Sequence, residues 1–228
     1  IHAEDGRCFM IGNGPSIKQM DLGPLRNEVT FVVNWFVKHP DFDNLGINYY
    51  CSSDPIHWHW QGREGMPPGL YEPLERHPEV VKFFEHTAEP VLRWQGVLQD
   101  ASVHFMRLDY SRGVYEGHVS LDISKRVFHG HTVLIDFCLP IAHYMGFREF
   151  YLLGVDMDYG VDVMSAAEQA GSYFYEQSDE TCRPVPDYIR KGQWVRRVFD
   201  SFTTMRKVFE ADGRRIYNAG IGGKLEVF

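Results

Sequence analysis

The sequence contains no apolar run near the length of a membrane-spanning helix, which needs about 20 residues. Residues 1–5 lack the basic and then apolar regions of a secretory signal peptide. The chain also has no internal repeat and no low-complexity tract. From the first of these absences we expect no transmembrane segment.

Cysteine and positive charge are both scarce. The four cysteines, Cys8, Cys51, Cys138 and Cys182, are scattered without a CxxC pair, and three lie in apolar stretches typical of buried free thiols. We therefore expect a cytoplasmic protein, with peripheral attachment to the inner membrane face as a further option. The 23 basic residues are outnumbered by 31 acidic ones, and this net charge of −8 argues against a nucleic-acid partner.

Hydrophobic residues make up 44% of the 228, enough for one sizeable domain spanning residues 1–228. Short apolar runs alternate with stretches of helical period. We predict strands at 7–11, 29–33, 48–53, 103–106, 150–155 and 215–218, and helices at 132–145 and 195–209. Pro140 should open the first helix because it supplies no N–H. The alternation predicts an α/β fold, with a Rossmann-like, doubly wound, mostly parallel sheet and helices on both faces.

Two stretches do not follow this alternation. Residues 61–100 combine proline, glycine and charge without a clear period, and we assign them no element. Residues 157–190 form a long connection rich in glycine, serine, glutamate and proline. So long a segment with little periodicity predicts a lid or mobile binding loop.

Polar clusters follow four of the predicted strands. They are Gly12-Asn13-Gly14-Pro15-Ser16, Asn34, Ser52-Ser53-Asp54 and Asp156-Met157-Asp158-Tyr159. Parallel sheets bind ligands in the crevice beyond the carboxyl ends of their strands. The sequence therefore predicts that these clusters meet at one site.

Each cluster has a functional and a structural interpretation. The glycines could let backbone N–H groups approach a phosphate at a helix N-terminus, or could form a tight turn with Ser16 as the N-cap. Asn34 and Asp54 could contact a base or a ribose, or could form turns. These alternatives stay open at the level of sequence.

The sequence also leaves open whether Asp156 and Asp158 bind a metal and whether the histidines take part in catalysis. Asp156 and Asp158 form a DxD pair that resembles the metal-binding element of many glycosyltransferases, although such pairs are common by chance. His129 and His131 precede a predicted helix near the crevice, where a histidine suits a general base or a donor to phosphate. The segment His57-Trp58-His59-Trp60 favours a surface or substrate-stacking role over a metal site.

An ordered set of motifs resembles two related groups of transferases. The motifs are Ile11–Ser16, Val33–Phe36, His131–Val133, Gly146–Asp156 and the tail Val208–Phe228. One group comprises the bacterial sialyltransferases that build lipooligosaccharide termini. The other is the motility-associated-factor glycosyltransferase group, whose domain is often labelled as like the archaeal 6-hydroxymethylpterin diphosphokinase. The tail is most similar to the second group.

The resemblance implies a glycosyltransferase domain that uses a CMP-activated nonulosonic acid without a metal. In the sialyltransferases, residues similar to Asn13, Ser16 and Asn34 contact the nucleotide. Asp54 stands where those enzymes have the asparagine of an Asn-Pro step. Thr132 lies in the loose counterpart of their Thr-Ser-Gly segment.

The resemblance also bears on catalysis. Asp156 and Tyr159 match a strand-end aspartate and a nearby tyrosine, and such tyrosines help to hold the leaving phosphate. The sialyltransferases carry a histidine base just before the late helix, whereas residues 190–195 contain no histidine. Either His131 or another residue replaces that base, or the chemistry differs, and His131 is our candidate.

The sequence thus predicts an inverting transfer of a sugar from a nucleotide-sugar donor, with a CMP-linked nonulosonic acid favoured, to a hydroxyl of a surface glycan or glycoprotein. The predicted catalytic residues are His131 and Tyr159, with no metal. The predicted nucleotide-binding residues are Gly12, Asn13, Gly14, Pro15, Ser16, Asn34, Asp54, Thr132 and Asp156.

Two other functions stay open. One is pyrophosphate transfer from ATP to 6-hydroxymethyl-dihydropterin, in which Asp156 and Asp158 would bind Mg²⁺. The other is a catalytically inactive module that binds a nucleotide or a glycan. Members of the related groups often form homo-oligomers, and the sequence leaves the oligomeric state undecided.

Overall fold

The computed structural model describes residues 6–60, 63–157, 173–176 and 193–228. Some of the predictions concern other residues. Those for Asp158, Tyr159 and Cys182, and for most of the 157–190 connection, lie outside the described residues.

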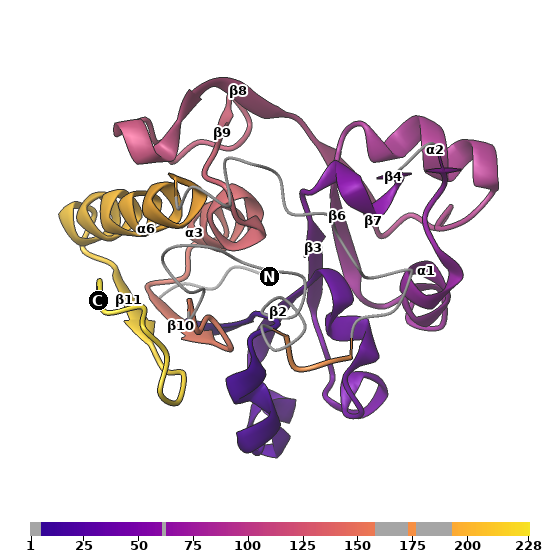
Figure 1. Ribbon diagram of the computed structural model, residues 1–228, viewed down its shortest axis with the longest axis horizontal. Coiled ribbons are helices and arrows are strands. Elements are labelled where there is room, and N and C mark those ends of the chain that lie inside the picture. The colour runs from indigo at the N-terminus through magenta and orange to yellow at the C-terminus, as the bar shows by residue number, and fades with distance from the viewer. Residues whose placement is uncertain (1–5, 61–62, 158–172, 177–192) are drawn as a thin grey trace.

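A seven-stranded sheet forms the centre of the molecule (Figure 1). Its strands lie in the spatial order β11-β10-β1-β2-β3-β6-β7, and every neighbouring pair is parallel. All of them except β6 fall within one or two residues of a predicted segment, which confirms the doubly wound α/β fold. The bounds are β1 (Arg7–Ile11), β2 (Val29–Val33), β3 (Tyr49–Ser52), β6 (Val81–Glu85), β7 (Val103–Met106), β10 (Glu149–Leu153) and β11 (Arg215–Asn218).

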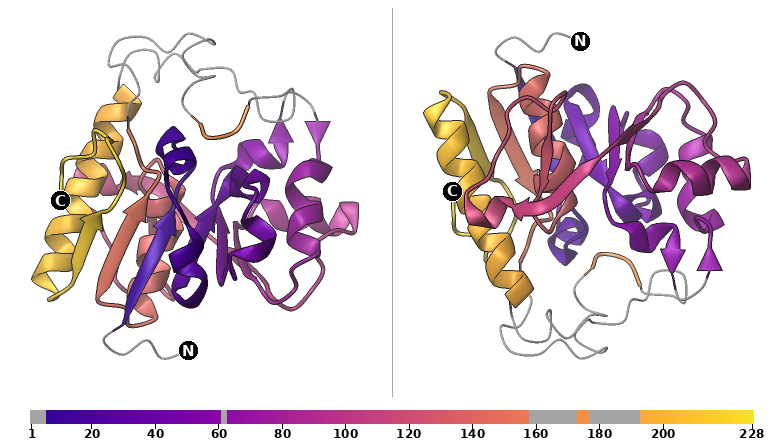
Figure 2. Two further views of the ribbon diagram at one scale, coloured as in Figure 1. Left: turned by 90° about the horizontal axis from the view of Figure 1, so that it is seen from below. Right: turned by 90° about the horizontal axis from the view of Figure 1, so that it is seen from above.

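Helices cover both faces of this sheet, as predicted (Figure 2). Successive residues of a strand point to opposite faces, so Phe31 and Val32 of β2 belong to different cores. One core includes η7 (Leu134–Cys138), α3 (Leu139–Tyr144) and α6 (Gln193–Ala211). The other includes η1 (Pro15–Gln19), η2 (Gly23–Asn27), η3 (Asn34–Lys38), η4 (Phe42–Asn44), α1 (Pro68–Glu75) and α2 (Ala88–Gln95).

The predicted helix at 132–145 is regular only in its second half. It begins with the π-helix η7, in which the Leu139 N–H bonds to the Leu134 carbonyl, and continues as α3. Pro140, just after this turn, has no N–H to donate to the carbonyl four residues earlier, so the wider turn occurs where proline was expected to open the helix. The carboxylate of Asp136, within η7, is buried.

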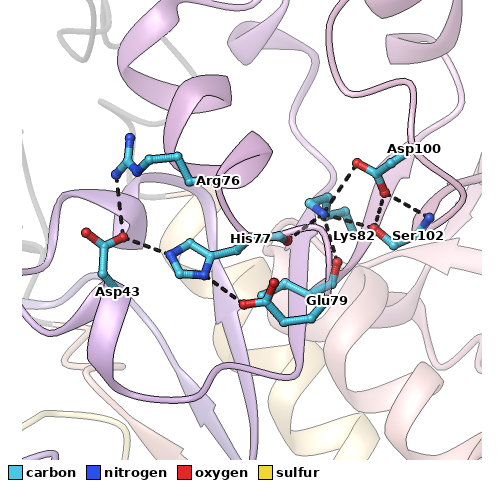
Figure 3. Close-up of polar contacts among 8 residues, drawn as sticks. Asp43, Arg76, His77, Glu79, Lys82, Asp100 and Ser102 are labelled. Atoms are coloured by element: carbon cyan, nitrogen blue, oxygen red, sulfur yellow. Dashed lines mark hydrogen bonds and ion pairs between the residues drawn. The ribbon is translucent and has the colours of Figure 1, made fainter.

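The unassigned stretch 61–100 contains two helices and two strands that the sequence did not reveal. Proline at the start of α1 and within it, at Pro73, obscures the helical period. In β6 the second residue is Lys82, which is fully buried (Figure 3). Its Nζ donates hydrogen bonds of 2.9 Å each to the His77 and Val80 carbonyls and to Ser102 Oγ, so a charged side chain occupies a position where the strand pattern calls for an apolar one.

Two smaller sheets complete the described structure. The pair β8 (Leu108–Gly113) and β9 (Val127–His129) lies near α3 and α6, with η6 (Val114–Glu116) packed on α6 (Figure 1). The pair β4 (His59–Trp60) and β5 (Arg63–Glu64) is antiparallel, after η5 (Pro55–His57). Within the described part of the chain, no helix has both the length and the apolar character to cross a bilayer.

Candidate functional site

The predicted polar clusters meet at the carboxyl edge of the sheet. The strands that precede them, β10, β1, β2 and β3, are spatial neighbours. Asn13 Nδ2 donates to the Val33 carbonyl at 3.1 Å, and Ser52 Oγ donates to Asn34 Oδ1 at 3.0 Å. Direct hydrogen bonds therefore connect the ends of β1, β2 and β3, and the described clusters lie together as the sequence predicted.

The glycines after β1 are required by the close approach of that loop to β10. The Gly12 and Gly14 N–H groups donate to the Leu153 and Gly154 carbonyls, each at 2.8 Å. A Cβ on Gly12 would lie 2.5 Å from the Gly154 oxygen, and one on Gly14 would lie 2.5 Å from Asp156 Oδ2. The structure thus gives both glycines a role within the fold.

Asp156 holds the same loop through its carboxylate. The Ser16 N–H donates to Asp156 Oδ2 at 2.7 Å, and Ser16 Oγ donates to Asp156 Oδ1. Pro15 begins η1, a short 3₁₀ helix, and the anion at its first turn is the carboxylate of the protein itself. Ser16 and Asp156 are paired with each other in this state, and a nucleotide contact by either stays a prediction.

The side-chain amides of Asn13 and Asn34 each have one polar atom without a hydrogen-bond partner among the described residues. Asn13 Oδ1 is buried and finds no partner among the described residues. Asn34 adopts a left-handed conformation with φ of 48°, which asparagine tolerates better than most residues. Ser52 occupies its oxygen, and within the described structure its amide nitrogen has no recorded partner. These two amides are the groups best suited to bind a ligand at this edge.

Part of the predicted lid is described, and it is anchored. The Phe174 N–H donates to the Asn13 carbonyl at 3.0 Å, and the Phe174 ring packs against Phe36. Phe174 and Tyr175 are buried in the core that also contains η3. At residues 173–176, therefore, two aromatic side chains pack beside Asn13, and the lid or mobile loop at 157–190 stays a prediction.

In the segment that begins at Asp54, the burial of His57 and Trp58 differs from the prediction. Asp54 Oδ1 accepts from the Ile56 N–H at 3.1 Å, so this carboxylate caps η5 as a turn former would. His57 and Trp58 are buried rather than on the surface, so the predicted surface or stacking role is wrong for them. His57 Nδ1 lies 3.0 Å from Ser52 Oγ, and Trp58 Nε1 donates to Thr87 Oγ1, which explains their burial.

Sequence reasoning missed the most connected acid of this edge, Asp136. Its side chain is 2% exposed, and it accepts from Ser53 Oγ at 2.7 Å and from the Gly130 N–H at 2.6 Å. His129 Nδ1 lies 3.3 Å from Asp136 Oδ1. A usable signal was present in the sequence, since an aspartate within Leu-Ile-Asp-Phe-Cys is a charge in an apolar run.

His131, the candidate base, is coupled to this acid through His129. His129 Nε2 and His131 Nδ1 are 3.2 Å apart, and the ring centroids are separated by 4.4 Å. His131 has a φ of 66°, and its carbonyl accepts from Trp194 Nε1 at the start of α6. The next residue, Thr132, lies just before η7, and its carbonyl accepts from the Ile135 and Asp136 N–H groups.

The two histidines have opposite pKa shifts. Burial of the His129 ring lowers its pKa, but the Asp136 carboxylate, with Asp54 farther away, outweighs burial and leaves the pKa above 6.5. Burial also lowers the pKa of His131, and the positive charges of His129 and Arg197 lower it further, to about 4. Near neutral pH, His131 is therefore uncharged, as a general base must be.

Comparison with known proteins finds similarity at the level of structure alone. No protein-family model matches the chain, and no curated protein does. A solved structure similar to it is the sialyltransferase CstII from Campylobacter jejuni in complex with a substrate analogue, cytidine-5'-monophosphate. The identity is 14%, the match covers 96% of this chain and 82% of that one, and the TM-score is 0.48. At that TM-score the likeness supports no functional conclusion.

Proposed function

We propose that this protein is a glycosyltransferase that moves a sugar from a nucleotide-sugar donor to a hydroxyl group of an acceptor. The observation that carries the proposal is the meeting, at the carboxyl edge of a parallel sheet, of an uncharged histidine and two amides that each have a group without a partner among the described residues. Such edges are where doubly wound sheets bind nucleotides. A transfer to a hydroxyl also requires a group that accepts its proton.

Each residue has a role in the proposed reaction. Asn13 and Asn34 would hydrogen-bond the nucleoside, while Ser16 and Asp156 would hold the glycine loop in position. His131 would accept the proton of the acceptor hydroxyl. Tyr159, which lies outside the described residues, would steady the leaving phosphate.

The choice of donor rests on the order of the sequence motifs. Their resemblance to the sialyltransferases favours a CMP-linked nonulosonic acid and a surface glycan or glycoprotein as acceptor. Metal independence belongs to the same proposal. Among the described residues, both carboxylate oxygens of Asp156 accept from Ser16, so a Mg²⁺ ion at this carboxylate would have to share these oxygens with the Ser16 hydrogen bonds.

Calorimetry with CMP, CDP, UDP, GDP and ATP, each with and without Mg²⁺, tests the proposal. We expect metal-independent binding of CMP or CDP. Binding of ATP only with Mg²⁺ would favour pyrophosphate transfer instead. Nucleotide binding without turnover of any CMP-sugar would indicate an inactive binding module, and no nucleotide binding at all would contradict the proposed function.

Substitution of Asn34 tests the nucleotide pocket directly. We expect Asn34→Ala to weaken nucleotide binding about fivefold, because one hydrogen bond contributes about 1 kcal/mol. Asn34→Asp tolerates the left-handed backbone and keeps the acceptor for Ser52, but replaces the amide donor with a carboxylate. Asn44→Ala, on the exposed end of η4, is the matched control. Unchanged affinity in both Asn34 variants would mean that the proposed pocket is wrong.

A further inference from the structure

Two ring nitrogens at the edge of the proposed site, His129 Nδ1 and His131 Nε2, are buried and have no hydrogen-bond partner among the described residues. Of these, His129 Nδ1 lies 3.3 Å from Asp136 Oδ1. Buried polar atoms are nearly always paired, because an unpaired one loses its hydration without compensation. His131 Nε2 therefore marks a position where a polar group of a ligand would bind.

The opposite side of the same ring leads to a second histidine and an acid. His131 Nδ1 is 3.2 Å from His129 Nε2, and His129 Nδ1 is 3.3 Å from Asp136 Oδ1. The three side chains thus form a line that ends at His131 Nε2. A line of this kind can pass a proton from one end toward the other.

Asp136 is held in one orientation by the backbone and by β3. Ser53 Oγ donates to its Oδ2 and the Gly130 N–H donates to its Oδ1. His129 Nδ1 lies 3.3 Å from Asp136 Oδ1 and makes no well-aligned hydrogen bond to a described residue. A carboxylate at this distance favours the tautomer of His129 that carries its proton on Nδ1, because an ionised carboxylate only accepts. His129 Nε2 is then free to accept the Nδ1 proton of His131, which leaves a lone pair on His131 Nε2.

We propose that Asp136 and His129 are the positioning and proton-holding partners of a catalytic His131, an inference that rests on the proposed function. The acceptor O–H proton moves to His131 Nε2, and the proton on His131 Nδ1 moves to His129 Nε2. The acceptor oxygen bonds to the anomeric carbon as the bond from that carbon to the phosphate oxygen breaks. The electron pair of that bond leaves with the nucleoside monophosphate.

The surrounding charges favour the final position of the proton. Asp136 on η7 and Asp54 after β3 both favour a cationic His129, whereas Arg197 on α6 opposes it. Arg197 and a protonated His129 both disfavour a cation at His131. The other titratable groups that contact the pair are the rings of Tyr110 and Tyr115, from β8 and η6.

A pH dependence follows from this arrangement. When His129 is protonated, its Nε2–H faces His131 Nδ1, and His131 then carries its proton on Nε2 and cannot act as a base. Transfer should therefore increase as the pH rises through the pKa of His129. The turnover number should change with this proton, while the KM for the donor should change little.

Long-range ¹H–¹⁵N spectra of the full chain labelled with ¹⁵N-histidine test the relay without any substrate. In the wild type, His129 should titrate above pH 6.5 and His131 should remain neutral down to about pH 4. In His129→Gln, the His131 midpoint should rise by about one pH unit or more, because the cationic neighbour is gone. Independent titration of both histidines near 6.5, or an unmoved His131 midpoint in His129→Gln, would overturn the proposal.

Asp136→Asn supplies the second variant. It should lower the His129 midpoint by about one unit and shift the pH profile of turnover in the same direction. Asp109→Asn, which changes a partly exposed carboxylate of β8 that accepts from Ser111, is the matched control and should shift neither. An Asp136→Asn protein with wild-type spectral dispersion and an unchanged His129 midpoint would contradict the relay.

Different results would contradict the proton relay and the proposed glycosyltransferase function. Nucleotide binding together with independently titrating histidines would overturn the relay and leave the proposed function intact. Coupled histidines in a chain that binds no nucleotide would overturn the proposed function, and with it the catalytic use of the relay.

Discussion

Single residues at the carboxyl edge are constrained by the backbone of a strand distant in sequence. Gly12 and Gly14 fit against the end of β10, and Asp156 accepts two hydrogen bonds from Ser16. A turn former and a ligand-binding loop have the same sequence signature. Position after a strand was therefore enough to predict which residues gather here, but not which of them bond to each other.

Gly14→Ala should lower the free energy of unfolding by about 1–3 kcal/mol, because its Cβ would overlap Asp156 Oδ2. Urea denaturation measures this loss. Gly23→Ala is the matched control, since its Cβ would meet only the side chain of Asp21, and it should cost much less. Equal losses in the two variants would show that the contact with Asp156 is not the cause.

At the scale of elements, β6 could not be recognised in the sequence because it contains a buried lysine, Lys82. Lys82 satisfies three acceptors and lies 3.6 Å from Asp100 Oδ2, so it joins the α1–β6 turn to the start of β7 (Figure 3). A hydropathy pattern counts Lys82 as charged, but it contains no information on the hydrogen-bond acceptors that allow this lysine to be buried. The π-helix η7 was only partly predictable. Pro140 in the sequence indicated that the helix would be irregular, but it did not indicate that the irregular turn would be a π-helix.

Lys82→Met should destabilise the protein by about 1–3 kcal/mol, although methionine fills a similar volume. The loss arises because the His77 and Val80 carbonyls and Ser102 Oγ would each lose a donor inside the protein. Chemical denaturation of Lys82→Met beside Lys125→Met, an exposed lysine paired with Asp122, separates this loss from the general effect of removing a charge. Similar stabilities of the two variants would contradict it.

The same group of side chains makes the stability depend on pH. His77 Nε2 is 2.9 Å from Asp43 Oδ1 and its Nδ1 is 2.8 Å from Glu79 Oε1 (Figure 3). Burial lowers the pKa of His77, but these carboxylates outweigh burial and raise it above 6.5. A raised pKa in the folded state stabilises the protein fully below pH 6.5, and this contribution is lost as the pH rises through the folded-state pKa.

His77→Gln should remove that part of the pH dependence. Between pH 6 and 8 the wild type should lose more stability than the variant, by less than about 1 kcal/mol because the carboxylates are exposed. Denaturation midpoints at several pH values measure the difference. His104→Gln, an exposed histidine of β7, should behave as the wild type does, and parallel curves for all three proteins would rule out the His77 pairing as the source.

At the scale of the whole molecule, the alternation of strands and helices determined most of the architecture in advance. Parallel order and two covered faces follow from short β-branched runs separated by helical periods. The link from His131 through His129 to Asp136 could not be predicted, because it depends on how the π turn directs one carboxylate toward a loop six residues before it.

Ligand binding should be visible in the stability of the molecule as a whole. If CMP binds the folded chain alone, CMP at a hundredfold excess over its Kd should add about 2.7 kcal/mol to the free energy of unfolding. Thermal melts with and without CMP test this, and Asn34→Ala should need more CMP for the same increase in Tm. Identical melts at every CMP concentration would contradict binding.

The contact between Ser16 and Asp156 spans 140 residues of sequence, and it has a consequence for synthesis. A ribosome adds about 5–20 residues each second, so β1 emerges roughly 10–30 s before β10, which pairs with it along one edge. During that interval the nascent chain carries an apolar strand with an open side, exposed to chaperones and to other chains. Among the described strands of this sheet, β1 is thus the one that waits longest for a neighbour, since β10 completes its second side.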